Sequence, residues 1–198
     1  MSTVYLVIPC YNEEAVLPET VKRLTDKLQR MIGSGLADEN SRFLLVDDGS
    51  KDKTWELIAG YCRENVFCSG LKLAHNRGHQ NALLAGLMAA KDKADCAISL
   101  DADLQDDIEV LDQFVNKFHE GCDVVYGVRN KRDTDSFFKR SSARGFYKVM
   151  RMLGVDVVYD HADYRLMSRR ALDALSEYHE VNLFLRGIVP LIGYRSDY

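Results

Sequence analysis

The sequence predicts an α/β fold in which helices flank a mostly parallel central sheet. Short apolar runs, typical of strands buried on both faces, alternate with stretches in which apolar residues recur at helical spacing. This alternation favours parallel pairing, because a strand needs a helical crossover to return in the same direction. The chain has 198 residues, of which 46% are hydrophobic and 28% charged, enough for one sizeable core and a small appendage.

Five strands are expected in the first 128 residues, because five short apolar runs end at clusters of polar residues. They are Val4–Ile8, Phe43–Val46, Gly70–Ala74, Cys96–Leu100 and Cys122–Val128. Helices are expected between them, where apolar residues such as Val21, Leu24 and Leu28 share one helical face. They are Glu14–Met31, Thr54–Cys62, an alanine- and leucine-rich stretch after HNRG (75–78), and Ile108–His119. Gly33–Ser41 is expected to be a polar connection.

The pattern changes after residue 128. Residues 129–136 are polar, and segment 137–154 carries five basic residues and no acidic one, mixed with aromatic and aliphatic side chains. Such a helix could lie on an anionic membrane surface, or pack on the sheet as an ordinary amphipathic helix. A strand is expected within residues 159–168, followed by a helix from near Arg169. The apolar stretch 182–198 is expected to stop without a closing helix.

Composition excludes several classes of protein. The net charge of −4 gives no global reason to expect nucleic-acid binding, and no run reaches the roughly 18 to 20 apolar residues that a membrane span needs. We expect no cleaved leader at the N-terminus. Five widely spaced cysteines without a CxxC pair favour reduced thiols facing the cytosol rather than disulfides or structural zinc. The GxGxxG, GxxxxGK[ST] and GxSxG patterns are all missing, which argues against dinucleotide, P-loop and serine-hydrolase sites.

A polar cluster follows each predicted strand. The clusters are PCYNEE (9–14), DDGS (47–50), HNRG (75–78), DADLQDD (101–107) and VRN (128–130). Each alone is explained by turn chemistry, since Asp, Asn and Gly are common in loops. Ligands of open parallel sheets bind at the carboxyl ends of the strands, so the whole set favours one binding site at that edge.

The cluster at 101–107 is the most informative. Asp101 and Asp103, two residues apart around a tight turn, can face one hard cation such as Mg²⁺ or Mn²⁺. Magnesium takes one or two protein carboxylates and completes its shell with water and substrate phosphates, so a phosphorylated ligand is implied. Asp106 and Asp107 are more consistent with the N-cap of the next helix.

Four motifs carry a family resemblance. VIPCYNEE, LLVDDGSKDKT, HNRGHQNALLAG and SLDADLQDD, in this order and spacing, resemble the family 2 glycosyltransferases of GT-A fold. More narrowly, they are similar to polyprenyl-phosphate sugar synthases such as dolichol-phosphate mannose synthase and bactoprenol-phosphate glucosyltransferases. YDHADYRLMSRRAL and FLRGIVPLIGY resemble the bactoprenol branch. The resemblance implies one GT-A catalytic domain over residues 1–198, with a Rossmann-like nucleotide-sugar half (1–128), an acceptor- and membrane-facing half (129–198), and transmembrane helices beyond Tyr198.

The resemblance also implies roles for single residues. The nucleotide sugar would be bound by Pro9, Tyr11, Glu13, Asp48, Asn76, Gly78, Asp101, Ala102 and Asp103, with Tyr11 stacking on the base and Asp48 hydrogen-bonding it. Asp103 would bind the Mg²⁺ or Mn²⁺ that bridges the diphosphate, and Gln105 would lie near the metal or the acceptor phosphate. The catalytic set would be Asp101, Asp103, Gln105, Arg129, Arg140, Arg144 and Arg165, whose arginines would meet acceptor or leaving phosphates. Arg165 stands where some relatives have lysine.

The implied reaction is an inverting, metal-dependent transfer of a hexose from a nucleotide sugar to a polyprenyl phosphate. UDP-glucose is the favoured donor and GDP-mannose the second. The acceptor phosphate is already an anion, so it needs no strong general base. The alternatives are a transferase of the same fold acting on a cell-surface polysaccharide, other saccharide or protein, and a non-catalytic nucleotide-sugar-binding protein. The resemblance places the full protein at the cytoplasmic face of a membrane, with this chain soluble, capable of self-association and without a nucleic-acid partner.

Overall fold

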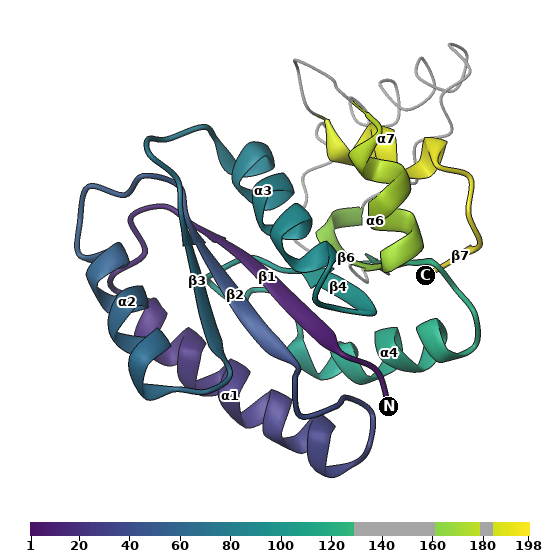
Figure 1. Ribbon diagram of the computed structural model, residues 1–198, viewed down its shortest axis with the longest axis horizontal. Coiled ribbons are helices and arrows are strands. Elements are labelled where there is room, and N and C mark those ends of the chain that lie inside the picture. Colours follow the sequence, from purple (N-terminus) through teal and green to yellow (C-terminus); the bar gives the residue numbers. More distant parts are fainter. Residues whose placement is uncertain (129–160, 179–183) are drawn as a thin grey trace, which may run out of the picture.

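A seven-stranded sheet between two layers of helices forms the structure, a computed structural model that describes residues 1–128, 161–178 and 184–198 (Figure 1). The strands are β1 (Val4–Cys10), β2 (Arg42–Asp47), β3 (Cys68–Lys72), β4 (Cys96–Ser99), β5 (Val124–Val128), β6 (His161–Ser168) and β7 (Ser196–Asp197). The helices are α1 (Leu17–Gly33), α2 (Thr54–Glu64), α3 (His79–Lys91), the 3₁₀ helix η1 (Ile108–Val110), α4 (Leu111–His119), α6 (Arg169–Ser176) and α7 (Leu185–Leu191).

The strand order is β3-β2-β1-β4-β6-β5-β7. β1 pairs in parallel with both β2 and β4, and β2 pairs in parallel with β3, so the carboxyl ends of these four strands meet at one edge. The predicted mostly parallel sheet is confirmed. One strand runs the other way: β6 lies between β4 and β5 and is antiparallel to both. Nothing in the sequence pattern indicates this insertion.

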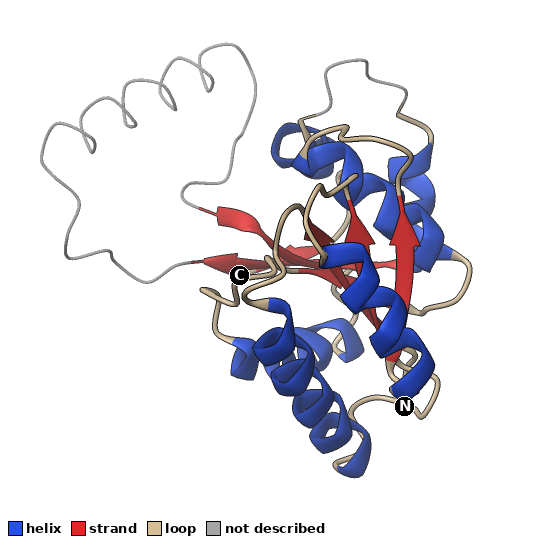
Figure 2. Ribbon diagram, turned by 90° about the vertical axis from the view of Figure 1, so that its left-hand side faces the viewer, coloured by secondary structure: helices blue, strands red, loops and turns tan. Residues whose placement is uncertain are grey.

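Alternation along the central strands divides the core between the two faces of the sheet. Leu6 and Ile8 of β1 pack with α1, α2 and α4, whereas Val7 packs on the opposite face with α3, α6 and α7. Each such fully buried aliphatic side chain contributes about 1.5–3 kcal/mol by leaving water. Figure 2 shows helices on both sides of the sheet. This packing fixes the strand ends on which the polar loops stand.

Two helices begin at residues whose side chains cap them. Asp107 is the N-cap of η1, since its Oδ1 accepts a hydrogen bond from the backbone N–H of Glu109 at 2.9 Å. The helix predicted at Ile108–His119 therefore begins with a 3₁₀ turn and continues as α4. Ser168 caps α6 through a 3.1 Å hydrogen bond from the N–H of Ala171, which confirms the helix predicted from near Arg169.

The expectation that the chain stops without a closing helix is wrong. Helix α7 buries Leu185, Ile188 and Val189 against the same face as α3 and α6. These residues lie on one side of a helix because they are three and four positions apart. Pro190 stands one residue before the end of this short helix, where it interrupts little of the hydrogen bonding. Beyond it, β7 pairs in parallel with β5.

Some predictions concern residues that the structure does not describe. Arg129, Arg140, Arg144 and the basic segment 137–154 lie outside the described residues.

All five cysteines are free, although the Sγ atoms of Cys62 and Cys68 are only 3.7 Å apart. In the described ranges, none of the helices combines the length and the apolar character needed to cross a bilayer.

Candidate active site

The loop after β1 is fastened to the loop after β2. The backbone N–H of Asn12 donates to Ser50 Oγ at 3.0 Å, and the N–H of Lys51 returns a hydrogen bond to Asn12 Oδ1 at 2.8 Å. The N–H of Glu13 donates to Thr54 Oγ1 at 2.8 Å. Asn12 has a φ of +57°, a left-handed conformation that Asn tolerates better than most residues. These bonds hold the residues after β1 in one defined conformation at the sheet edge.

The three predicted ligand residues of this segment differ in exposure. Pro9 is buried inside β1, whereas the Tyr11 side chain is 39% exposed and can be reached by a ligand. Glu13 is partly buried, and burial raises the pKa of its carboxyl, with the charges of Asp103, Asp52 and Asp101 adding to the rise. The loop after β1 therefore shares its electrostatic environment with the loop after β4.

Asp48 joins the loop after β2 to the loop after β3. It is buried, and its two carboxylate oxygens accept hydrogen bonds from the backbone N–H groups of Arg77 and Gly78, at 2.7 and 2.9 Å. Gly49 beside it has a φ of +67°, and a Cβ there would lie 2.6 Å from the backbone nitrogen of Asn76. The predicted hydrogen bond between Asp48 and a nucleobase stays a prediction, while the contacts of Asp48 in the structure clamp two loops together.

The segment 101–107, which we call the acidic loop, presents the predicted metal ligand. Asp103 is exposed, and its Oδ1 accepts a 3.2 Å hydrogen bond from the backbone N–H of Gln105, which is also exposed. Ala102 between the two carboxylates is buried, and its carbonyl accepts a hydrogen bond from Thr20 Oγ1 at 2.6 Å. The buried alanine thus anchors the turn to α1 and leaves the Asp103 carboxylate toward solvent.

Asp101 has an unusual electrostatic environment. Burial raises the pKa of its carboxyl; the charge of His79 opposes the rise, and the charges of Asp106, Asp103 and Asp163 add to it. Negative charge is therefore concentrated here, and a cation bound beside Asp101 would relieve the repulsion.

These donors suit a hard divalent cation that is also held by a ligand. Asp101, Asp103 and Glu13 offer only oxygen atoms, which Mg²⁺ and Mn²⁺ prefer. Within the described part of the chain, no three His, Cys, Asp or Glu residues converge closely enough to hold a metal by themselves. A site with one or two carboxylates, completed by water and phosphate oxygens, fits this arrangement.

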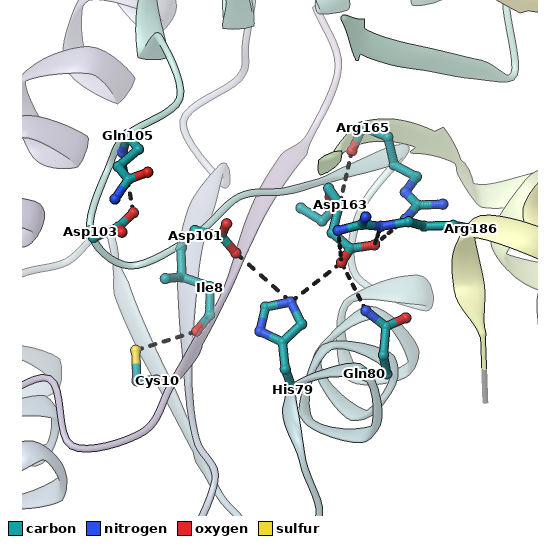
Figure 3. A network of polar contacts seen from close by, with 11 residues as sticks. Ile8, Cys10, His79, Gln80, Asp101, Asp103, Gln105, Asp163, Arg165 and Arg186 are labelled. Atoms are coloured by element: carbon teal, nitrogen blue, oxygen red, sulfur yellow. Dashed lines mark hydrogen bonds and ion pairs between the residues drawn. The ribbon is translucent and has the colours of Figure 1, made fainter. Parts of the chain in front are cut away.

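A second group of polar residues, absent from the predicted site, lies beside the acidic loop (Figure 3). His79, at the start of α3, places its Nε2 atom 3.8 Å from Asp101 Oδ1 and 3.7 Å from Asp163 Oδ2. Asp163, on β6, is buried and accepts a 2.8 Å hydrogen bond from Gln80 Nε2. Strand β6 brings this carboxylate to the site because Ser99 at the end of β4 pairs with Arg165 in the antiparallel register.

Asp163 is shared by two arginines. Arg165, two residues along β6, donates from Nη2 to Asp163 Oδ1 at 2.5 Å and from Nη1 to the Leu185 carbonyl at 3.3 Å. Arg186 of α7 donates from Nε to Oδ1 at 3.3 Å and from Nη2 to Oδ2 at 3.1 Å. Burial alone would raise the pKa of Asp163, but the hydrogen bond from Arg186 and the charges of both arginines outweigh it and lower the pKa.

The arginine predicted from β6 does not reach the surface. Arg165 is only 2% exposed, and burial lowers the pKa of its guanidinium despite the charge of Asp163. Its predicted contact with a phosphate stays a prediction, and the buried geometry gives that contact no support. The arginine of this network that solvent reaches is Arg186, whose side chain is 44% exposed.

Residues 5–176 match the family model described as glycosyl transferase family 2. The chain belongs to this family. It is 56% identical over 191 residues to an uncharacterized glycosyltransferase, YkoT, of Bacillus subtilis (strain 168), covering 96% of this chain and 57% of that protein. It is 33% identical to the bactoprenol glucosyl transferase of Shigella phage SfV, covering 97% of this chain and 60% of that protein. The chain thus spans less than two thirds of the length of these curated relatives.

Solved glycosyltransferase structures share the fold. The mannosyltransferase PcManGT from Pyrobaculum calidifontis, in complex with GDP-Man and Mn²⁺, matches with a TM-score of 0.66 at 18% identity, over 99% of this chain and 54% of that one. Glucosyl-3-phosphoglycerate synthase from Mycobacterium tuberculosis, in complex with Mn²⁺ and UDP, matches with a TM-score of 0.60 at 20% identity, over 87% of this chain and 59% of that one. The predicted GT-A fold and the family 2 resemblance are confirmed.

In this family 2 chain, the structure brings together part of the predicted site. After β1 and β4, the charges of Asp101 and Asp103 add to the raised pKa of Glu13, and the charge of Asp103 adds to the raised pKa of Asp101. Sequence reasoning missed a group on three separate elements, namely His79, Gln80, Asp163 and Arg186. One available signal was the pair Asp163 and Arg165, since residues two apart in a strand share one face and opposite charges there can form a buried ion pair.

Proposed function

We propose that this chain is the catalytic part of a family 2 glycosyltransferase that transfers a hexose from a nucleotide sugar to a polyprenyl phosphate. The observation that carries the proposal is the concentration of negative charge after β1 and β4, where the charges of Asp101 and Asp103 add to the raised pKa of Glu13, in a chain 33% identical to a bactoprenol glucosyl transferase. Residues 1–128 would bind the nucleotide sugar, and residues 129–198 would face the acceptor and the membrane.

The favoured donor is UDP-glucose, because relatives of this chain are named bactoprenol glucosyl transferases; GDP-mannose is the second candidate. Asp103 would hold Mg²⁺ or Mn²⁺ with the donor's diphosphate, and Asp101 would orient the sugar nucleotide beside it. The cation, when bound, supplies charge neutralisation for the diphosphate leaving group. Tyr11, exposed at the end of β1, would stack on the base.

The state of Asp163 fits an acceptor that is already an anion and needs no base from this residue. A saccharide hydroxyl needs a general base, and a carboxylate with a lowered pKa that is bound by two arginines is a poor base. A lipid phosphate needs none, so it can attack the anomeric carbon directly. One displacement inverts that carbon and gives a β-linked polyprenyl-phosphate sugar from an α-linked donor.

The proposed location is the cytoplasmic face of a membrane, where nucleotide sugar and lipid acceptor meet, and self-association there is part of the proposal. The test incubates the purified protein with UDP-glucose, GDP-mannose or other UDP-sugars, with and without a polyprenyl phosphate, in Mn²⁺, Mg²⁺ or EDTA. We expect a lipid-linked hexose only with a metal and the lipid, and a β-linkage by NMR. Transfer to a saccharide acceptor but not to lipid, or an α-linked product, contradicts the proposal.

A further inference from the structure

The two arginines on Asp163 leave a surplus of positive charge at the edge of the candidate active site. Arg165 alone neutralises the carboxylate, through a 2.5 Å contact in the protein interior. Gln80 Nε2 adds a further hydrogen bond to it at 2.8 Å. Arg186 is therefore not required to compensate the buried charge, and its proximity lowers the pKa of Arg165 through like-charge repulsion, after the larger effect of burial.

The surplus charge is open to solvent. The Arg186 side chain is 44% exposed, whereas the Asp163 carboxylate that holds it is 7% exposed. Arg186 Nε and Nη2 face Asp163, and the described residues provide no hydrogen bond to Nη1. A guanidinium held through Nε and Nη2 still carries its positive charge and the two N–H donors of Nη1, with which it can bind a further anion such as a phosphate.

The position of Arg186 connects it to the acidic loop. Asp163 Oδ2 is 3.1 Å from Arg186 Nη2 and 3.7 Å from His79 Nε2, and the same His79 atom is 3.8 Å from Asp101 Oδ1. Figure 3 shows Asp101, His79, Asp163 and Arg186 following one another across the site. An anion on Arg186 would thus lie beside the place where the donor's sugar is expected, and on the side away from Asp103.

We propose that Arg186 binds the phosphate monoester of the acceptor, and that Asp163 is a positioning residue that aims the Arg186 guanidinium. This inference rests on the proposed function and assigns its acceptor site to a residue of α7. The donor's diphosphate has similar chemistry, but it is expected at Asp103, on the far side of His79. An arginine that served only to dock α7 would be indifferent to either ligand.

The test measures binding without turnover. Farnesyl phosphate is titrated into the full chain in the presence of UDP and Mn²⁺, with farnesol as the uncharged control, and UDP affinity is measured separately. We expect Arg186→Gln to weaken farnesyl phosphate binding at least tenfold and to leave UDP affinity within twofold. Arg186→Lys should lose less, because it keeps the charge but not the fork.

Arg170 offers a matched control. It is also an exposed arginine on a mostly buried aspartate, Asp123, but it follows β6 and lies at the opposite edge of the sheet. Arg170→Gln should leave both affinities within twofold. Asp163→Asn should weaken farnesyl phosphate binding by a smaller factor, and the double variant with Arg186→Gln should bind no worse than Arg186→Gln alone.

Several outcomes overturn the assignment. They are unchanged farnesyl phosphate binding in Arg186→Gln, an equal loss of UDP affinity, and wild-type binding no tighter than that of farnesol. If Arg186→Gln does not fold, Arg186→Lys decides: a threefold or greater loss of farnesyl phosphate binding supports the proposal and an unchanged affinity overturns it. Wild-type binding through Arg186 without any sugar transfer would leave the phosphate site standing and sink the proposed function.

Discussion

The role of Asp48 gives the sharpest test of how the loops of this site are held. Asp48→Asn keeps the shape of the side chain but replaces one carboxylate oxygen with an NH₂ group that cannot accept the N–H of Arg77 or Gly78. A hydrogen bond to a charged group contributes about 1.5–3 kcal/mol net. We therefore expect the free energy of unfolding to fall by about 2–3 kcal/mol, since the orphaned N–H group also has to find a new partner.

This loss can be measured by urea denaturation and by the thermal midpoint. For a chain of this size, 1 kcal/mol corresponds to about 2–4 °C, so the midpoint should fall by about 4–12 °C. Hydrogen exchange should accelerate at the amides of Arg77 and Gly78 in the variant. The control is Asp92→Asn, which changes an exposed carboxylate at the far end of α3 and should shift the midpoint by less than about 2 °C.

The opposite result would establish the nucleobase role that the family resemblance implies. If Asp48→Asn leaves the midpoint within about 1 °C and exchange unchanged, but weakens UDP binding tenfold, the clamp is refuted and Asp48 acts on the ligand. A lower thermal midpoint together with faster exchange at Arg77 and Gly78 supports the clamp. Saturating UDP and Mn²⁺ should then restore the midpoint, because a ligand that binds only the folded state compensates for lost stability.

Three further predictions test the metal site, the buried ion pair and the loop contact. Asp103→Asn should abolish the Mn²⁺ dependence of UDP binding in calorimetry and change stability by less than about 0.5 kcal/mol, because the side chain is exposed; a variant that still needs Mn²⁺ contradicts the assignment. The pKa of Asp163 is lowered from its ordinary value of 3.8, so its ionised form stabilises the fold above about pH 4, and this stability is lost as the pH falls through the folded pKa; urea midpoints between pH 2.5 and 6 should show this loss in the wild type and not in Asp163→Asn. Gly49→Ala should destabilise by at least about 2 kcal/mol, from the left-handed backbone and the 2.6 Å approach to Asn76, whereas Gly60→Ala in α2, with open space around it, should stabilise by about 0.5–1 kcal/mol.

Local signals were sufficient to predict most strands and helices of residues 1–128. The continuous apolar runs of β1, β2 and β4 identify buried strands, and the Asp107 cap locates a helix start. The acidic loop could also be placed correctly, since its position follows from the end of β4 and the direction of a parallel strand. In each case the information lies within about ten neighbouring residues.

The rest depends on long-range topology. β6 lies between β4 and β5 although β5 precedes it in sequence, and a run such as HADYRLMS does not reveal its direction. His79, Asp163 and Arg186 are separated by 84 and 23 residues, and only this strand order brings them together. The same strand carries Arg165 inward, because its register places that side chain between the sheet and α7. A charged residue such as Arg165 is expected at the surface unless an opposite charge nearby, here Asp163 two residues away, is recognised as its buried partner.

Strand β6, whose place in the sheet the sequence pattern does not indicate, also explains how one site could accept the two phosphate-bearing ligands of the proposed reaction. Glu13, Asp101 and Asp103 form a negative side that calls for a cation and its diphosphate, whereas Arg165 and Arg186 outnumber the single carboxylate of Asp163 on the other side. Two phosphate groups repel each other, so a reaction between them needs separate charge compensation for each. A sheet with β5 directly beside β4 would lack the second side, because the arginines reach the site through β6 and α7. In the proposed reaction, the antiparallel insertion would separate the donor position from the acceptor position, with the imidazole of His79 between them.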